Sequence, residues 1–328
     1  MDPKLIELMQ TVKTPLELNC KTGDRIVIVT DYEFDPLVWQ AMAAAATQMG
    51  MEPTVVMMPT RAAHQSEPTR AVAEAIKSSD VNIFLTSKAL SHSKAAKEGY
   101  GTNKIRTIIM EQATYSILTS PVAKADYFKI GEVAKRVQDA FTRAKVMTVV
   151  TEAGTNITAS VEGRRALCTA GRVDPENGQY FCAFPDGEVP IIPVEGTGNG
   201  TVVWDTSAHH IEGRLLKAPI KIKVKDGWAT EITGGDDAQA LVEYIEKYGD
   251  KNSYNCPAEF AIGLNPNARP RGNVREDKKL AGYAHIAMGS TAGIISNLYS
   301  KLHLDGIMKD ATITCDGKIV VDKGEVLV

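Results

Sequence analysis

Hydrophobic positions in the N-terminal part of the chain form short continuous runs, and these runs alternate with segments that have helical spacing. The stretch RIVIVTD (residues 25–31) is such a run, and the Ala-rich stretch after it predicts a helix that Gly50 stops. Continuous apolar runs between helices are typical of strands buried on both faces of a parallel sheet. The same pattern predicts strands at residues 53–58, 81–87 and 104–111 and helices at residues 67–79, around 94 and at 129–144.

From about residue 145 the pattern changes to apolar–polar alternation that is broken by tight turns. Asp226-Gly227 lies between two strand-like runs in IKIKVKDGWATEIT, and Asp316-Gly317 has the same context. An Asp-Gly pair between alternating runs is a strong signal for a β-hairpin. We therefore expect an α/β N-terminal domain with a parallel sheet at residues 1–145, and a β-rich (α+β) C-terminal domain with the candidate metal site at residues 146–328.

Composition and charge narrow the classes of partner. Apolar residues make up 44% of the 328 residues and charged residues 23%, as in a globular protein with a full core. The net charge of -3 and the pI near 6.1 argue against a nucleic-acid partner, and no apolar run approaches the ~20 residues that span a membrane. The N-terminus lacks a basic-then-apolar export signal, and the five scattered cysteines contain no C-x-x-C pair. These features predict reduced thiols and a cytoplasmic location, with no nucleic-acid and no membrane partner.

Five side chains in the C-terminal half have the chemistry of metal ligands. Glu259 and His285 each interrupt an apolar segment, where a polar group is costly to bury unless it is paired or coordinated. His303 and Asp305 are two positions apart in LHLDGIM, so on a strand their side chains point to the same face. Glu188 follows a Pro-Asp-Gly turn.

Each of these residues also has an ordinary structural explanation. His285 could be a core histidine bonded to a backbone carbonyl, Glu259 an exposed strand residue, and Glu188 a surface charge at the edge of a turn. As a set, two glutamates, two histidines and one aspartate suit a divalent ion such as Mn, Zn, Fe or Co. Such an ion activates water and polarises a carbonyl group.

The order of these residues resembles that of the M29 metallopeptidases, the aminopeptidase T type. The matching segments are Gly-Glu-Val at residues 187–189, Ala-Glu-x-x-Ile-Gly-x-Asn-Pro at 258–266, Gly-x-x-His-x-Ala-x-Gly at 282–289 and His-x-Asp at 303–305. The resemblance covers most of the C-terminal domain, whereas the N-terminal part is compatible in architecture only. Peptidases of this family hold two metals and form dimers, so the resemblance implies one or two divalent ions per chain and a homodimer or higher homo-oligomer. The metal-site residues that it implies are Glu188, Glu259, His285, His303 and Asp305.

The chain departs from the M29 pattern in length and at one catalytic position. It is shorter than typical M29 peptidases, and the segment between its two motif histidines is abbreviated. The position that corresponds to the family's catalytic tyrosine is Ala292, and neither Tyr283 nor Tyr299 matches the motif. A peptidase without that hydroxyl lacks a donor for its tetrahedral oxyanion, which weighs against peptidase activity.

A second group, the 2,5-dihydroxypyridine 5,6-dioxygenases, also looks similar. These enzymes share the His-Leu-Asp of residues 303–305 and use iron and oxygen to open a hydroxylated ring. They carry a histidine at the position that we align with Glu259, so the glutamate here gives a more anionic site. A set of His285, His303 and Asp305 would still provide the two imidazoles and one carboxylate of an iron dioxygenase.

We expect a divalent-metal-dependent hydrolase that acts on a small polar carbonyl substrate. The favoured reaction is ring-opening C–C hydrolysis of a cyclic diketone, like that of a dihydrophloroglucinol cyclohydrolase, with Glu188 or Glu259 as the general base. The alternatives are an M29-type aminopeptidase, an iron ring-cleaving dioxygenase, and a non-enzymatic metal-stabilised binding protein. Further candidates, which could equally be surface or loop residues, are three arginines that could anchor an anionic substrate and a histidine pair of which one could reach the site: Arg164, Arg269, Arg271, His209 and His210.

Overall fold

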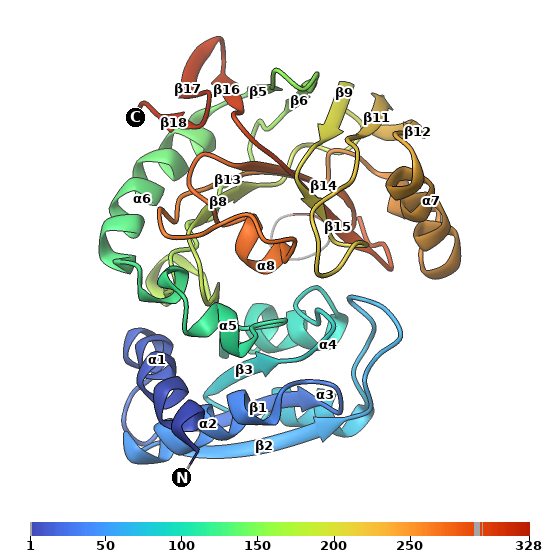
Figure 1. Cartoon of the computed structure of the whole chain (residues 1–328). Coiled ribbons are helices and arrows are strands. Elements are labelled where there is room, and N and C mark those ends of the chain that lie inside the picture. Colours follow the sequence, from blue (N-terminus) through green and yellow to red (C-terminus); the bar gives the residue numbers. More distant parts are fainter. Residues whose placement is uncertain (1, 292–295, 297) are drawn as a thin grey trace. The chain divides into compact units, whose positions relative to one another are not determined.

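The computed structural model describes residues 2–291, 296 and 298–328, and its chain divides into two compact units (Figure 1). The first unit consists of Met1–Tyr127 and Thr169–Asp186, and the second of Phe128–Cys168 and Gly187–Val328. This division differs from the single boundary expected after residue 145. The reason is that a strand late in the sequence, β7, returns to the sheet of the first unit, while nearly all of helix α6 belongs to the second.

The first unit contains a parallel sheet with helices between its strands. Its strands are β1 (Arg25–Asp31), β2 (Glu52–Met58), β3 (Val81–Leu85), β4 (Arg106–Ile109) and β7 (Phe181–Ala183). Its helices are α1 (Pro3–Asn19), α2 (Pro36–Gln48), α3 (Arg70–Ile76), α4 (Lys94–Lys97), η1 (Glu98–Thr102), α5 (Tyr115–Leu118), η2 (Pro121–Lys124) and η3 (Pro175–Asn177). Within the described part of the chain, no helix has both the length and the apolar character needed to cross a membrane.

The order of the parallel sheet is β2-β1-β3-β4-β7. Every residue of β3 is buried, as the continuous apolar pattern predicted for a strand covered on both faces. Helix α2 starts at Asp35, whose side chain accepts from the backbone N–H of Leu37, and Pro36 takes the first helical position. Gly50 follows the helix with φ +78°, so the predicted glycine stop is confirmed.

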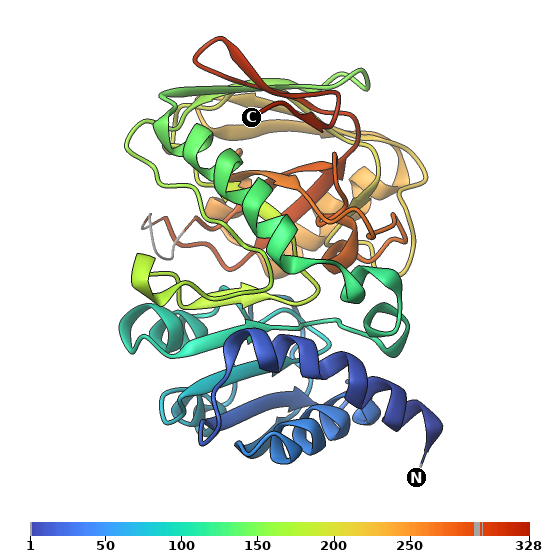
Figure 2. The same cartoon turned by 90° about the vertical axis from the view of Figure 1, so that its left-hand side faces the viewer.

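The second unit contains two antiparallel sheets and the helix that leads into them. Its strands are β5 (Val146–Val150), β6 (Asn156–Ser160), β8 (Glu188–Ile191), β9 (Asn199–Trp204), β10 (Ser207–Ala208), β11 (Ile220–Lys225), β12 (Trp228–Thr233), β13 (Glu259–Gly263), β14 (Ala284–Gly289), β15 (His303–Met308), β16 (Thr312–Cys315), β17 (Lys318–Asp322) and β18 (Glu325–Val326). Its helices are α6 (Tyr127–Arg143), α7 (Asp236–Tyr248), η4 (Lys251–Tyr254) and α8 (Val274–Asp277). Helix α6, the long green helix in Figure 2, lies obliquely in front of the strands of this unit. Its Gln138 donates a hydrogen bond to the carbonyl oxygen of Ala166.

The eight-stranded sheet of the second unit confirms the predicted hairpins. Its order is β12-β11-β9-β6-β5-β16-β17-β18. Alternate residues of β11 are buried and exposed, with the isoleucines and valine inward and the lysines outward. Both Asp-Gly turns have a positive φ at the aspartate, 49° at Asp226 and at Asp316, which is the backbone of a two-residue hairpin loop. The expected parallel α/β layer and the β-rich region are therefore both present.

Candidate metal centre

The other sheet of the second unit, of order β10-β15-β14-β13-β8, carries all five predicted site residues. Glu259 on β13 pairs with Ala287 on β14, and Ala287 pairs with Asp305 on β15. Directly opposed residues of antiparallel strands point to the same face, so the two carboxylates face each other across Ala287.

The remaining three residues reach this face by the two-residue periodicity of a strand. His285 and His303 each lie two positions from a member of that row, and Glu188 on β8 pairs with Gly263, four positions from Glu259. The sheet therefore brings Glu188, Glu259, His285, His303 and Asp305 onto one face, and all five are buried.

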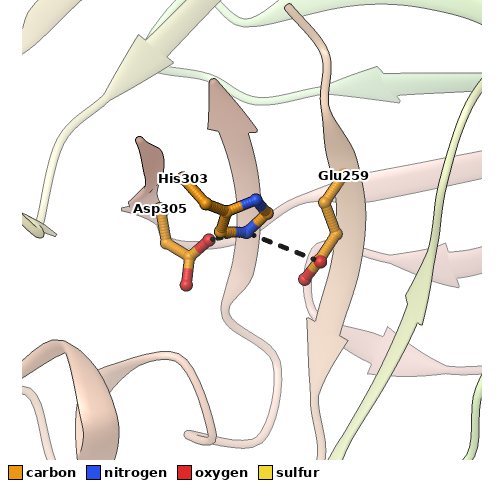
Figure 3. Close-up of side chains that lie close together, drawn as sticks. All are labelled: Glu259, His303 and Asp305. Carbon is orange, nitrogen blue, oxygen red and sulfur yellow. Dashed lines mark ion pairs between the residues drawn. The ribbon is translucent and has the colours of Figure 1, made fainter. Parts of the chain in front are cut away.

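The tightest donor group consists of Glu259, His303 and Asp305 (Figure 3), with one ligand atom from each lying within 4.8 Å of the others. Nε2 of His303 lies 3.0 Å from Oδ1 of Asp305 and 3.7 Å from Oε2 of Glu259. Ala287 contributes only a methyl group between the strands of the two carboxylates. A larger side chain at this position would extend between the two carboxylates.

A hydrogen bond to the backbone orients His303 in this group. Its Nδ1 lies 2.8 Å from the carbonyl oxygen of Ser290, which can only accept, so Nδ1 carries a hydrogen. In the neutral ring Nε2 then has a lone pair that faces two carboxylates, and this arrangement is repulsive unless a cation or a proton lies between them. Burial alone lowers the pKa of His303, but the negative charges of Asp305 and Glu259 outweigh it and raise that pKa above its usual value.

Glu259 also connects this group to the other two predicted residues. Nε2–H of His285 donates to Oε1 of Glu259 at 3.0 Å, and the same nitrogen lies 3.7 Å from Oε2 of Glu188. Glu259 thus faces one imidazole with each carboxylate oxygen. The ordinary explanations considered for His285 and Glu259 do not hold, because the imidazole is bonded to a carboxylate and Glu259 is 7% exposed.

Two lysines that the sequence motifs did not indicate place positive charges beside the carboxylates of this group. Nζ of Lys279 lies 2.6 Å from Oε1 of Glu188, and Nζ of Lys278 lies 2.9 Å from Oδ2 of Asp305 and 3.9 Å from Oε1 of Glu188. Lys279 is fully buried and Lys278 is 9% exposed. Lysines in a polar segment ordinarily lie at the surface, so the stretch REDKKLAG gives no local signal for them beyond a Lys-Lys pair close to the histidine motif.

The lysines determine the ionisation of two of the carboxyl groups. Burial by itself raises the pKa of Glu188, but the neighbouring charges of Lys278 and Lys279 reverse the shift and lower the pKa to about 2. Burial is likewise outweighed at Asp305, whose pKa is held well below its usual value by Lys278 and the nearby imidazoles. Both groups are therefore carboxylates at neutral pH, the form that binds metal ions.

The donor set fits a divalent metal ion by its chemistry. Glu259, His303 and Asp305 supply carboxylate oxygens and an imidazole nitrogen, which are ligands for Mn, Fe, Co or Zn. The Nδ1–H of His303 donates to a backbone carbonyl oxygen, as the free ring nitrogen of a metal-ligating histidine ordinarily does. Because Nε2 of His303 faces two buried carboxylates, and all three residues offer ligand atoms to one point, we treat them as a candidate metal centre.

The adjacent histidines His209 and His210 contact different parts of the unit, and only His209 lies near the candidate site. Nδ1 of His209 accepts from the backbone N–H of Asp305 at 3.0 Å, so this nitrogen has no hydrogen to offer the Asp305 carboxylate 3.7 Å away. Nε2–H of His210 donates to the carbonyl oxygen of Asp237 at 2.9 Å, and burial lowers the pKa of His210. His209 therefore supports the strand that carries Asp305, whereas His210 is directed to helix α7.

The arginines and tyrosines considered from the sequence make other contacts. Arg164 pairs with Glu195 at 2.5 Å, Arg271 with Glu276 at 3.5 Å, and Arg269 donates to the carbonyl oxygen of Ala268 at 2.6 Å. Half of the Tyr299 side chain is exposed. The position aligned with the catalytic tyrosine of the peptidases, residue 292, lies outside the described residues.

Similarity to known proteins extends over nearly the whole chain. Residues 7–328 match the model of the NicX family, described as 2,5-dihydroxypyridine 5,6-dioxygenase. A 2,5-dihydroxypyridine 5,6-dioxygenase from Pseudomonas putida strain KT2440 is 24% identical over 195 residues, which are 56% of this chain and 55% of that protein. The aligned region thus spans about half the length of this curated relative.

Two solved structures share the fold of this chain. The structure of the 2,5-dihydroxypyridine dioxygenase from Pseudomonas putida KT2440 superposes with a TM-score of 0.78 at 18% identity, over 99% of this chain and 98% of that one. Wild-type AmpT from Thermus thermophilus, of the M29 aminopeptidases, superposes with a TM-score of 0.70 at 14% identity, over 98% and 99% of the two chains. Both resemblances seen in the sequence are therefore confirmed, and the family match shows that this chain belongs to the NicX (2,5-dihydroxypyridine 5,6-dioxygenase) family.

Proposed function

We propose that this protein is a divalent-metal-dependent enzyme that opens a small oxygenated ring by hydrolysis, with a cyclic 1,3-diketone as its substrate class. The observation that carries this proposal is the position of Glu259, whose carboxylate lies between the two imidazoles. The donor group that faces a common point therefore has one imidazole and two carboxylates. Iron dioxygenases of the facial-triad type use two imidazoles and one carboxylate, so the extra anionic ligand favours metal-assisted addition of water.

Of the five residues expected at the metal site, Glu259, His303 and Asp305 are the proposed ligands, and His285 and Glu188 lie beside them. A divalent ion at this site would lower the pKa of a bound water and polarise the substrate carbonyl. His303 and Asp305 would hold the ion, because their ligand atoms are already oriented by Ser290 and Lys278. Glu259 contributes a carboxylate whose Oε2 faces His303 and whose Oε1 accepts a hydrogen bond from His285.

Glu259 is the better of the two expected general bases. Glu188 is held by two ammonium groups and its pKa is lowered to about 2, so it is a weak proton acceptor. In the proposed reaction Glu259 accepts a proton from the attacking water as the water oxygen bonds to one carbonyl carbon. The bond from that carbon to the carbon between the two carbonyls then breaks, and the electron pair left on the latter carbon takes up the proton. The product is an open-chain keto acid, equal in atoms to the diketone plus one water.

Ring-cleaving dioxygenation is the second candidate, and the family match favours it. His285, His303 and Asp305 share one face of the sheet and offer two imidazoles and a carboxylate. For iron to use this set, the hydrogen bond between His285 and Glu259 would have to open, because Nε2 of His285 donates to that carboxylate. Aminopeptidase activity, the third candidate, is supported by the shared fold and by the order of the M29-like sequence motifs.

The deciding experiment uses the full chain loaded with Mn²⁺ in the absence of dioxygen. We expect it to convert 1,3-cyclohexanedione or dihydrophloroglucinol to the open keto acid, with one ¹⁸O atom from labelled water in the new carboxyl group. Glu259→Gln should abolish the reaction, whereas His210→Gln, away from the site, should retain it. A strict requirement for Fe²⁺ and dioxygen would establish the dioxygenase instead, and cleavage of aminoacyl anilides would establish the peptidase.

The oligomeric state is a further part of the proposal. The M29 resemblance implies a homodimer or a higher homo-oligomer with a small-molecule substrate. Light scattering at micromolar concentration gives the mass directly. A mass equal to the 35.5 kDa of one chain would contradict this part of the proposal.

A further inference from the structure

Lys278 and Lys279 are adjacent, buried and directed to the carboxylates of the candidate metal centre. They follow helix α8 (Val274–Asp277), and the backbone N–H of Lys279 donates to the carbonyl oxygen of Glu276. Their ammonium groups contact Glu188 on β8 and Asp305 on β15.

A glycine in the sheet allows this segment to approach so closely. Gly263 pairs with Glu188, and a Cβ at Gly263 would lie 2.3 Å from the carbonyl oxygen of Leu280 and 2.8 Å from that of Lys278. Any side chain at this position would push the lysine segment off the face. The close contact of the lysines with the site therefore depends on a glycine at this position of strand β13.

The two lysines together carry the same charge as one divalent ion. The three carboxylates of Glu188, Glu259 and Asp305 supply three negative charges, and the two ammonium groups supply two positive charges. One divalent ion together with the lysines leaves the same net charge as two divalent ions without them. A second divalent ion added to the intact site would leave three uncompensated positive charges in a buried place, which is strongly unfavourable.

The position of the lysines agrees with the binding of one ion that this charge balance favours. A second ion beside Glu259 would use Glu188 and His285, since Nε2 of His285 lies 3.7 Å from Oε2 of Glu188. Oε1 of Glu188 is already bonded to Lys279 at 2.6 Å, and Lys278 lies 3.9 Å from the same oxygen. The positive charges of the two ammonium groups therefore lie beside Glu188, where the charge of a second ion would otherwise lie.

We propose that Lys278 and Lys279 act as a built-in substitute for a second divalent ion and limit the site to one ion, held at the Glu259–His303–Asp305 end. The inference rests on the metal dependence in the proposed function. It assigns the lysines as positioning residues, because they hold Glu188 and Asp305 and exclude a second ion.

The test is the number of ions bound per chain, measured without reference to activity. Metal-free protein is dialysed against Mn²⁺ at a series of buffered free concentrations, bound manganese is counted by mass spectrometry, and electron paramagnetic resonance detects coupled ion pairs. We expect one ion and an uncoupled signal for the wild type. We expect two ions and a coupled signal for the double variant Lys278→Met/Lys279→Met, since Glu188 then lacks its cations.

Two control variants keep the charge or leave the site intact. Lys279→Arg retains the cation, and Lys318→Met removes an exposed lysine from strand β17, so both should bind one ion. If the double variant fails to fold without metal, the single variant Lys278→Met should bind a second ion at a lower free Mn²⁺ concentration than the wild type.

The outcomes separate this inference from the proposed function. Two ions in the wild type, or one ion in the lysine variants with no change in affinity for a second, would overturn the role of the lysines while leaving a metal enzyme in place. No ion in any variant would overturn the metal dependence itself.

Discussion

The imidazole of His303 is fixed by the carbonyl oxygen of Ser290, which lies 2.8 Å from Nδ1. The bond determines which nitrogen carries the hydrogen and leaves Nε2 directed to Asp305 at 3.0 Å. The pair thus gives this strand histidine the defined orientation that a metal ligand requires. Metal binding should therefore depend on His303, on the pH and on Ala287, and the stability of the metal-free protein should depend on Glu188.

Removal of the His303 imidazole should abolish metal binding. We expect His303→Ala to lower the affinity for Mn²⁺ by more than about a hundredfold. A direct ligand contributes more than the groups that hydrogen-bond to ligands, whose loss costs about 10- to 100-fold. Metal content after dialysis measures this. His210→Gln changes a histidine of the same unit that is bonded to Asp237, so its metal content should equal that of the wild type.

Metal affinity should fall steeply in acid because His303 must lose a proton before Nε2 binds an ion. Burial lowers the pKa of His303, but Asp305 and Glu259 raise it above its usual value of 6.5. Below the raised pKa, affinity should fall by about tenfold per pH unit. Calorimetric titration between pH 5.5 and pH 8.5, a range chosen around that value, measures the slope, and a flat profile would show that this histidine is not a ligand.

The methyl group of Ala287 should be the largest side chain that the site tolerates between its carboxylates. Ala287 pairs with both Glu259 and Asp305. We expect Ala287→Val to cost about 1 to 3 kcal/mol of unfolding free energy from overpacking and to weaken metal binding. Ile286→Val, on the opposite face of the same strand, should cost about 1 kcal/mol and leave metal binding unchanged. Equal metal affinity in both variants would contradict the site geometry.

Loss of the Glu188 charge should destabilise the metal-free protein in a pH-dependent way. At neutral pH, Glu188→Gln leaves Lys279 buried without its carboxylate and should cost about 3 kcal/mol of unfolding free energy. The pKa of Glu188 is lowered from 4.5 to about 2, so its stabilising effect is complete above 4.5 and is lost as the pH falls towards 2. Urea unfolding of both proteins at several pH values measures the difference, which should shrink across that interval; a constant difference would contradict the assigned ion pair.

Much of the fold could be predicted from local patterns. The run at residues 25–31 formed β1 with the same bounds, and both Asp-Gly pairs formed hairpins, because strand and turn formation depend on neighbouring residues. The return of β7 to the parallel sheet left no such trace, since pairing with β4 depends on residues far apart in the chain.

The five candidate ligands could be named from the sequence because their types and order are read directly, and the spacing of His303 and Asp305 already placed both on one strand face. Which of them lie together was decided only by the tertiary structure. The register across β13, β14 and β15 grouped Glu259 with His303 and Asp305. The pairing of β8 with β13 at Gly263, against which the lysine segment packs, placed Glu188 beside Lys279. Lysine burial depends on the absence of a side chain at Gly263, on a different strand, so no local pattern in the sequence could show it. The sequence by itself determined the ligand chemistry, whereas long-range packing decided the charge balance, because electrostatic energies depend on distances between residues that only the fold brings together.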